Sequence, residues 1–127
     1  MFDVFVYGSV LAGERNHHHI APFLKAVQPG TLRGRLYDTG NGYPALVLDD
    51  VNGYEVVGEW YLITGAGLKK FDELEEYFGP GHPDNEYDRV QVKDLHHNRE
   101  GWVYVWHDSR GCREVASGSW RKHLGRE

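Results

Sequence analysis

The first structured element of the chain is predicted from the stretch Phe5-Val6-Tyr7-Gly8-Ser9-Val10. Residues 4–7 are apolar and β-rich, which favours a buried strand, and Gly8-Ser9 ends that strand. A strand that stops at a glycine can turn sharply and direct successive backbone N–H groups into one cavity, where they hold a carboxylate or a developing oxyanion. From these residues alone, an ordinary turn that merely ends the strand is the simpler interpretation.

A second informative stretch, in the middle of the chain, is Phe71-Asp72-Glu73-Leu74-Glu75-Glu76-Tyr77. Apolar residues at helical spacing predict a helix from Leu68 to Tyr77. Glu75 lies beside the apolar stripe of this helix, and partial burial there would raise its pKa and suit it to proton transfer near neutral pH. Glu76 is rotated by about 100° and is expected to face water. The alternative is that all four acidic residues form a solvated helix face.

Composition limits the class of protein. A length of 127 residues with 40% hydrophobic residues favours one folded domain, residues 1–127. The net charge of −5 and the lack of a Lys/Arg stripe argue against nucleic acid as a partner. No apolar run approaches the roughly 20 residues of a membrane span, and the start of the chain does not resemble a signal peptide. A single cysteine, Cys112, excludes an intramolecular disulfide and fits a cytoplasmic location.

The order of the predicted elements indicates an α+β fold. A helix is expected over residues 17–26, a break at Pro29-Gly30, a hairpin turn at residues 50–53 and a closing turn or helix over residues 117–124. Strands are expected at residues 4–7, 32–37, 45–48, 56–63, 87–92 and 102–106. Many short strands with a few helical insertions predict a small mixed, barrel-like sheet with flanking short helices.

The histidines invite a metal-binding interpretation, which the sequence does not favour. His17-His18-His19 lacks the i, i+4 spacing that places two ligands on one helix face, and no matching Cys or Asp half-site is present. We therefore expect no metal site.

The chain resembles the γ-glutamylcyclotransferase-like proteins, the AIG2-like or BtrG-type superfamily, over almost its whole length. Each matching segment is modest alone, but their number and order are specific. The segments are Val6-Tyr7-Gly8-Ser9-Val10, Gly13-Glu14-Arg15-Asn16-His17-His18, Gly42-Tyr43-Pro44-Ala45-Leu46, Val57-Gly58-Glu59-Trp60-Tyr61, Phe71-Asp72-Glu73-Leu74-Glu75-Glu76-Tyr77, Tyr87-Asp88-Arg89-Val90, Trp102-Val103-Tyr104-Val105 and Ser117-Gly118-Ser119-Trp120.

The resemblance implies a fold, a reaction and a set of site residues. The fold is a small mixed barrel with flanking helices, and the reaction is cyclisation of a γ-glutamyl group to 5-oxoproline with release of an amine or amino acid. Glu75 matches the family's general acid/base. The substrate-binding loop matches Tyr7, Gly8, Ser9 and Val10, and Tyr87 is expected to close the pocket.

The resemblance also carries expectations about partners, and it shows departures. No cofactor is needed, because the nucleophile is part of the small-molecule γ-glutamyl substrate. The sequence itself leaves the oligomeric state open between a monomer and a homodimer. Val10 and Phe71 each stand where the family usually has Leu, and Glu76 stands where it usually has Gly. The charge of Glu76 would lie beside the cavity and bear on the size or polarity of the substrate. The alternative function is a non-catalytic module of the same fold that binds a small carboxylated ligand.

Overall fold

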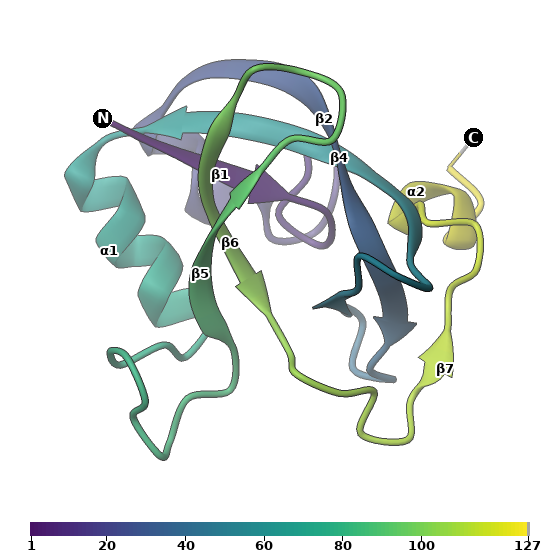
Figure 1. Ribbon diagram of the computed structural model, residues 1–127. Coiled ribbons are helices and arrows are strands. Elements are labelled where there is room, and N and C mark those ends of the chain that lie inside the picture. The colour runs from purple at the N-terminus through teal and green to yellow at the C-terminus, as the bar shows by residue number, and fades with distance from the viewer. Residues whose placement is uncertain (127) are drawn as a thin grey trace.

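One mixed sheet curls around the core in the computed structural model, which describes residues 1–126 (Figure 1). The order across the sheet is β3-β2-β4-β1-β6-β5, with β7 paired to β2. The β1–β6 pair is parallel and the other neighbouring pairs are antiparallel. The strands are β1 (Phe2–Val6), β2 (Leu24–Asp38), β3 (Pro44–Leu48), β4 (Tyr54–Ile63), β5 (Asp88–Lys93), β6 (Glu100–Val105) and β7 (Arg113–Glu114). The predicted α+β class with a barrel-like sheet is confirmed.

Strand β1 lies in the middle of the sheet and is buried on both faces. Val4 and Val6 belong to one core cluster, whereas Phe5 and Tyr7 belong to the other. A strand covered on both faces needs an unbroken apolar run in place of an alternating pattern, and this explains the composition of residues 4–7.

The curl of the sheet brings β3 close to β6, and a tyrosine hydroxyl closes the seam between them. The Trp106 N–H donates to the Leu46 carbonyl at 2.9 Å. The N–H of the same residue, Leu46, donates to the Tyr7 hydroxyl at 3.2 Å, and that hydroxyl donates to the Tyr104 carbonyl at 2.6 Å. The side chain of Tyr7, the residue that follows β1, therefore supplies the link that a direct strand–strand hydrogen bond would otherwise make.

Two short α-helices flank the sheet on opposite sides in the view of Figure 1, α1 (Gly65–Leu74) and α2 (Trp120–His123). Thr64 begins α1 by accepting a hydrogen bond from the Gly67 N–H, and the helix buries Leu68 and Phe71 against the sheet. No helix within residues 1–126 is long and apolar enough to cross a membrane.

The prediction of a helix over residues 17–26 is wrong. Two short 3₁₀ turns, η1 (His17–His19) and η2 (Ala21–Phe23), occupy the first part, and β2 begins at Leu24. Pairing with β4 along most of its length outweighs the local signal in this segment, because a strand gains its stability from partners distant in sequence.

The break predicted at Pro29-Gly30 is also absent, since both residues lie inside β2, opposite Glu59 and Gly58 of β4. Within residues 1–126, this half of β2 pairs with β4 on one side, and its other side is an edge of the sheet. Such an edge position tolerates the missing N–H of proline. Gly30 is needed for space, because a Cβ there would lie 2.5 Å from the ring of Trp60.

Candidate active site

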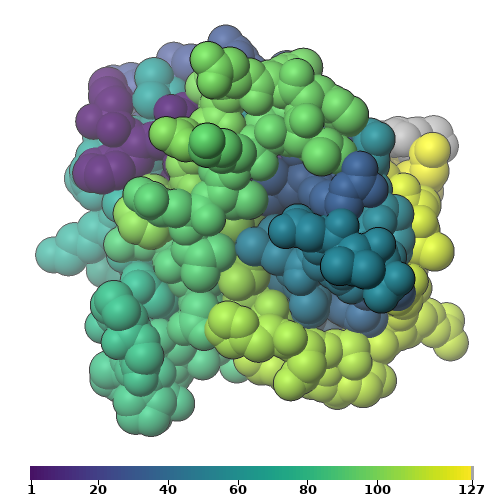
Figure 2. Space-filling model, in the orientation of Figure 1, coloured from purple at the N-terminus to yellow at the C-terminus, as the bar shows by residue number. Residues whose placement is uncertain are grey.

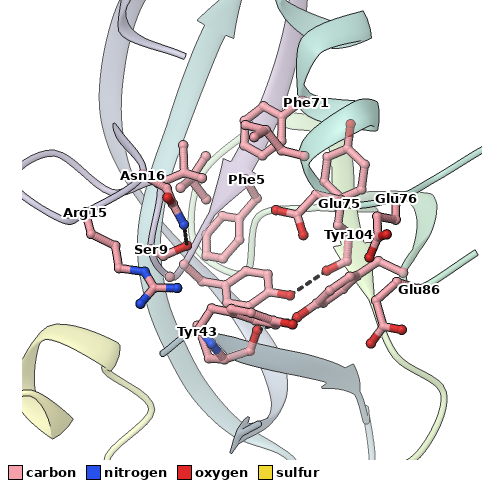
Figure 3. Close-up of a pocket in the computed structure, with 17 residues that line it drawn as sticks. Phe5, Ser9, Arg15, Asn16, Tyr43, Phe71, Glu75, Glu76, Glu86 and Tyr104 are labelled. Atoms are coloured by element: carbon pink, nitrogen blue, oxygen red, sulfur yellow. Dashed lines mark hydrogen bonds between the residues drawn. The ribbon is translucent and has the colours of Figure 1, made fainter. Parts of the chain in front are cut away.

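A cavity of about 160 Å³ opens where β1 ends, between the loop that follows β1 and the C-terminal end of α1 (Figure 3). Its walls come from segments that are far apart in sequence. They are lined by Phe5, Val6, Tyr7, Gly8, Ser9, Val10, Arg15, Asn16, Tyr43, Pro44, Phe71, Leu74, Glu75, Glu76, Glu86, Tyr87 and Tyr104. All six of the site residues predicted from the sequence thus line one cavity.

The loop after β1 is tied down by its own hydrogen bonds. The Leu11 N–H donates to the Gly8 carbonyl at 3.0 Å, and the Asn16 N–H donates to the Ser9 carbonyl at 2.9 Å. The Asn16 side-chain amide also donates to Ser9 Oγ at 3.0 Å. Within residues 1–126, the backbone N–H groups of Gly8, Ser9 and Val10 donate to no acceptor. Three consecutive free donors at a cavity wall can hold an anionic group.

Gly8 is required by close packing, because a Cβ at this position would lie 2.5 Å from Cδ of Pro44. We expect Gly8→Ala to push the loop away from β3 and to lower kcat/KM for the cyclisation that the family resemblance implies by at least about tenfold, since displacements of about 1 Å at a reacting centre are costly. Steady-state kinetics measures the effect. Ser9→Ala is the matched comparison, because it keeps the backbone N–H and removes only the hydroxyl. Equal activity of Gly8→Ala and wild type would contradict a positioning role for the loop.

Glu75 is directed into the cavity from the end of α1 (Figure 3). The predicted helix over residues 68–77 is too long by three residues, because α1 ends at Leu74 and Glu75 is its C-cap. The helix ends in a Schellman motif, in which the Tyr77 N–H donates to the Asp72 carbonyl at 2.9 Å and the Glu76 N–H to the Glu73 carbonyl at 3.3 Å. This motif fixes the backbone on both sides of the Glu75 side chain.

The Glu75 carboxyl group has an unusual environment. Protein atoms surround it, the exposure of the residue is intermediate because the cavity opens onto it, and it forms no side-chain hydrogen bond with residues 1–126. Burial raises the pKa of Glu75 from its ordinary 4.5 to about 8. A carboxyl group that titrates near neutral pH and has no protein partner is available to accept and donate protons.

Three tyrosines form walls of the cavity with hydroxyl groups that are already engaged. Tyr7 bridges β3 and β6 as described above, and the Tyr87 hydroxyl donates to the Pro44 carbonyl at 2.9 Å. The Tyr104 hydroxyl donates to Oδ1 of Asp72 at 2.6 Å. Burial raises the pKa of all three hydroxyls well above the ordinary value, so each stays protonated at neutral pH.

A charged pair lies behind Tyr104. The Asp72 carboxylate accepts hydrogen bonds from the Arg89 guanidinium at 2.9 and 3.0 Å, and Arg89 lies over the rings of Tyr77 and Trp102. These contacts join α1 to β5 and β6 and fix the Tyr104 wall. Local sequence reasoning had no signal for them, because Asp72 and Arg89 are 17 residues apart on different elements.

Residues 4–122 match the model of a family described as "Gamma-glutamyl cyclotransferase, AIG2-like". The chain belongs to this family. It is therefore a member of an enzyme family, as the resemblance of its motifs indicates.

Individual AIG2-like relatives agree with this assignment. The chain is 43% identical over 108 residues to a protein of Niallia circulans named gamma-L-glutamyl-butirosin B gamma-glutamyl cyclotransferase, covering 84% of this chain and 67% of that protein. The crystal structure of an AIG2-like protein from Mus musculus has a TM-score of 0.67 at 18% identity, over 87% of this chain and 80% of that one. An uncharacterized protein of Pyrococcus horikoshii has a TM-score of 0.71 at 16% identity, over 99% and 95%. The two structures support the AIG2-like fold.

Arg15 is a cavity residue that sequence reasoning did not assign, although it lies in one of the segments that resemble the AIG2-like family. Its guanidinium donates to the Asn41 carbonyl at 3.2 Å and packs against Gly42, where a side chain would clash with it. Within residues 1–126 it forms no ion pair with a carboxylate. Arg15 thus places an uncompensated positive charge at the edge of the cavity, next to the loop after β1 (Figure 3).

His17, the first residue of the His17-His18-His19 run, has a structural contact. His17 Nδ1 lies 2.8 Å from the Val10 carbonyl and, because a carbonyl only accepts, donates to it, which braces the loop after β1. Within the part of the chain that the structure describes, no group of three His, Cys, Asp or Glu side chains is arranged to hold a metal ion.

Proposed function

We propose that this protein catalyses intramolecular cyclisation of a γ-glutamyl amide, in which 5-oxoproline forms and an amine or amino acid leaves. The main support for the proposal is the Glu75 carboxyl group, which forms no hydrogen bond or ion pair with residues 1–126 and opens onto a cavity whose wall carries N–H groups that are free within the same residues. Membership of the γ-glutamyl cyclotransferase family supports the same reaction class.

The nucleophile is the α-amine of the substrate. The amine nitrogen attacks the γ-carbonyl carbon, a C–N bond forms to close the five-membered ring, and the original amide C–N bond breaks. The enzyme has to fold the γ-glutamyl chain so that amine and carbonyl meet, which is the entropic part of catalysis. The reaction as written consumes no co-reactant.

Glu75 is assigned the proton transfers. Its carboxylate accepts a proton from the α-ammonium group, which frees the amine to attack, and the resulting carboxylic acid donates that proton to the departing nitrogen. The ring nitrogen then gives its second proton to the regenerated carboxylate and becomes the lactam N–H, and the released amine takes up that proton. A pKa of about 8 for Glu75 is close to the value of roughly 8 for an α-amino group. Proton transfer between groups of matched pKa needs little driving force, so one residue can serve in both directions.

The negatively charged oxygens of the substrate are assigned to the opposite wall. The N–H groups of Gly8, Ser9 and Val10 hold the oxyanion that develops on the γ-carbonyl, and the guanidinium of Arg15 holds the α-carboxylate. Tyr7 and Tyr87 shape the walls that confine the glutamyl chain. The acyl-enzyme route is not needed, because the attacking amine is part of the substrate.

The pH profile of the reaction is expected to have an acidic limb near pH 8. Below that pH, Glu75 in the free enzyme and the α-amine of the substrate both carry protons, so no base is present to start the reaction. We expect kcat/KM to fall by up to about tenfold for each unit of pH below the limb. Initial rates at constant ionic strength measure it. A flat profile between about pH 6 and pH 8 would contradict Glu75 as the base.

The direct test is release of 5-oxoproline from a panel of γ-glutamyl amino acids and γ-glutamyl amines. Release supports the proposal, and the preferred member identifies the leaving group. Thermal stabilisation by a panel member without any product would instead indicate the binding module. The cytoplasmic location, the independence from a cofactor and the monomeric or homodimeric state stay predictions.

A further inference from the structure

The mouth of the cavity is bordered by the base of a loop. The segment between α1 and β5 projects from the body of the molecule, as its blue-green surface in Figure 2 shows. Its two ends are joined, because the Glu86 N–H donates to the Glu76 carbonyl at 3.0 Å. Asn85 ties the loop internally, through its contacts with the Phe78 N–H at 2.7 Å and the Gly79 carbonyl at 2.7 Å. Both glutamates at this base line the cavity.

The two glutamates differ in their electrostatic state. Glu86 pairs with Arg110 at 2.9 Å, and Arg110 lies over the ring of Trp106, so the charge of Glu86 is largely compensated. Glu76 is exposed and forms no ion pair or side-chain hydrogen bond with residues 1–126. The free negative charge at the mouth therefore belongs to Glu76.

The cavity is electrically polarised. Figure 3 shows Arg15, with Ser9 and Asn16, on one side and Glu75, Glu76 and Glu86 on the other. A substrate whose α-carboxylate lies at Arg15 directs the opposite end of the molecule towards the glutamates. That opposite end is the leaving amine.

The volume of the cavity places the leaving amine at the mouth. A cavity of about 160 Å³ is comparable to one that holds benzene. It therefore encloses little more than the group that becomes the five-membered ring. In a substrate bound with its α-carboxylate at Arg15, substituents on the leaving nitrogen would therefore extend past Glu76 into solvent.

The backbone at Glu76 indicates that its side chain does not serve the fold. Its φ of +53° lies in the left-handed region, at the position of the Schellman motif that glycine occupies most often. The exposed carboxylate contributes no contact that offsets this conformational cost. A glutamate at this position is explained by a role at the cavity mouth.

We propose that Glu76 selects γ-glutamyl amides whose leaving amine carries an additional positive charge, an inference that rests on the proposed cyclisation. The carboxylate attracts a second ammonium group on the leaving amine and disfavours a carboxylate there. Because Glu76 is exposed and lies outside the reacting atoms, its effect falls on KM and is weakened by salt.

The test compares three substrates of similar length: the mono-γ-glutamyl amides of a four-carbon diamine, of pentylamine and of γ-aminobutyrate. At low ionic strength, wild type should prefer the diamine amide over the pentylamine amide by about fivefold in kcat/KM, with the γ-aminobutyrate amide last. Glu76→Gln should remove most of this preference through KM. Glu73→Gln is the matched control, because Glu73 is an exposed acid on α1 that does not line the cavity.

The outcomes separate the inference from the reaction. Release of 5-oxoproline with no preference for the diamine amide, or a preference that survives in Glu76→Gln, overturns the inference alone. No release from these three amides, while γ-glutamyl amino acids of the panel still release 5-oxoproline, also overturns the inference alone. No release from any γ-glutamyl amino acid or amine by wild type overturns the proposed reaction and the inference with it. Glu76→Gly should lose the preference and unfold at the same or a higher temperature than wild type, since glycine relieves the left-handed backbone; lower stability would indicate a structural role instead.

Discussion

Replacing Glu75 by glutamine is expected to lower kcat for 5-oxoproline release by about 10³-fold or more, with the protein still folded. Glutamine keeps the size and the neutral polarity of the protonated acid, but it cannot exchange a proton. General acid–base catalysis by one side chain contributes about 10²–10⁴-fold, and Glu75 is assigned both transfers. Rapid-quench or steady-state assays on the preferred panel member measure the loss.

A matched variant and a check of folding make that result specific. Glu73→Gln removes a carboxylate from the same helix at a position outside the cavity, and should retain wild-type activity. Circular dichroism and thermal unfolding show whether each variant is folded. Comparable activity of Glu75→Gln and Glu73→Gln would show that Glu75 takes no part in the mechanism. Catalysis would then have to be assigned to the loop after β1.

The second large effect concerns stability. The folded-state pKa of Glu75, about 8, is raised above the 4.5 of an unfolded chain, because burial disfavours the charged form. The folded protein therefore holds this proton more tightly than the unfolded chain does. Its stabilising contribution is complete below about pH 4.5 and is lost as pH rises through about 8. Each unit of pKa corresponds to about 1.4 kcal/mol, so the shift from 4.5 to about 8 makes the loss on the order of 5 kcal/mol.

Glu75→Gln isolates this contribution, since all other titrating groups are shared with wild type. Urea unfolding at about pH 5 should give similar stabilities for the two proteins, whereas at about pH 9 the variant should be more stable by several kcal/mol. The same substitution would thus abolish activity and stabilise the fold, as expected where a site stores an unfavourable charge. Parallel stability curves from pH 5 to pH 9 would show that the Glu75 carboxyl group is well hydrated in the folded state.

The features that the sequence predicts correctly are those set by local pattern. The unbroken apolar run at residues 4–7 and the spacing of Phe71 and Leu74 are visible in the order of residues, and the place of Glu75 beside that stripe predicts its partial burial. The acid/base role of Glu75 is an expectation that comes from the family resemblance. The early end of α1 is not visible, because the left-handed residue that ends it is Glu76 and no glycine marks the position.

Features set by distant partners are invisible in the local pattern. The local pattern of residues 24–31 predicts the end of a helix followed by an interruption at Pro29-Gly30. These residues form a strand because they pair with β4, which lies about 30 positions further along the chain. Arg15 is held by the space that Gly42 leaves, and neither residue predicts the other. The expectation that Gly8 and Ser9 bind substrate comes from the resemblance to the family, because their short motif alone does not predict it.

The bridge that Tyr7 makes between β3 and β6 has a consequence for the transient opening of the cavity. One oxygen atom satisfies both the Leu46 N–H and the Tyr104 carbonyl, and the same ring forms a cavity wall. When β3 and β6 separate, the hydrogen bond from the Leu46 N–H to Tyr7 breaks and the amide proton of Leu46 becomes available to deuterium exchange. The ring of Tyr7, which forms a cavity wall, moves in the same event. The exchange rate of that single amide therefore reports the opening of the cavity, and a ligand that binds only the closed cavity slows it in proportion to occupancy.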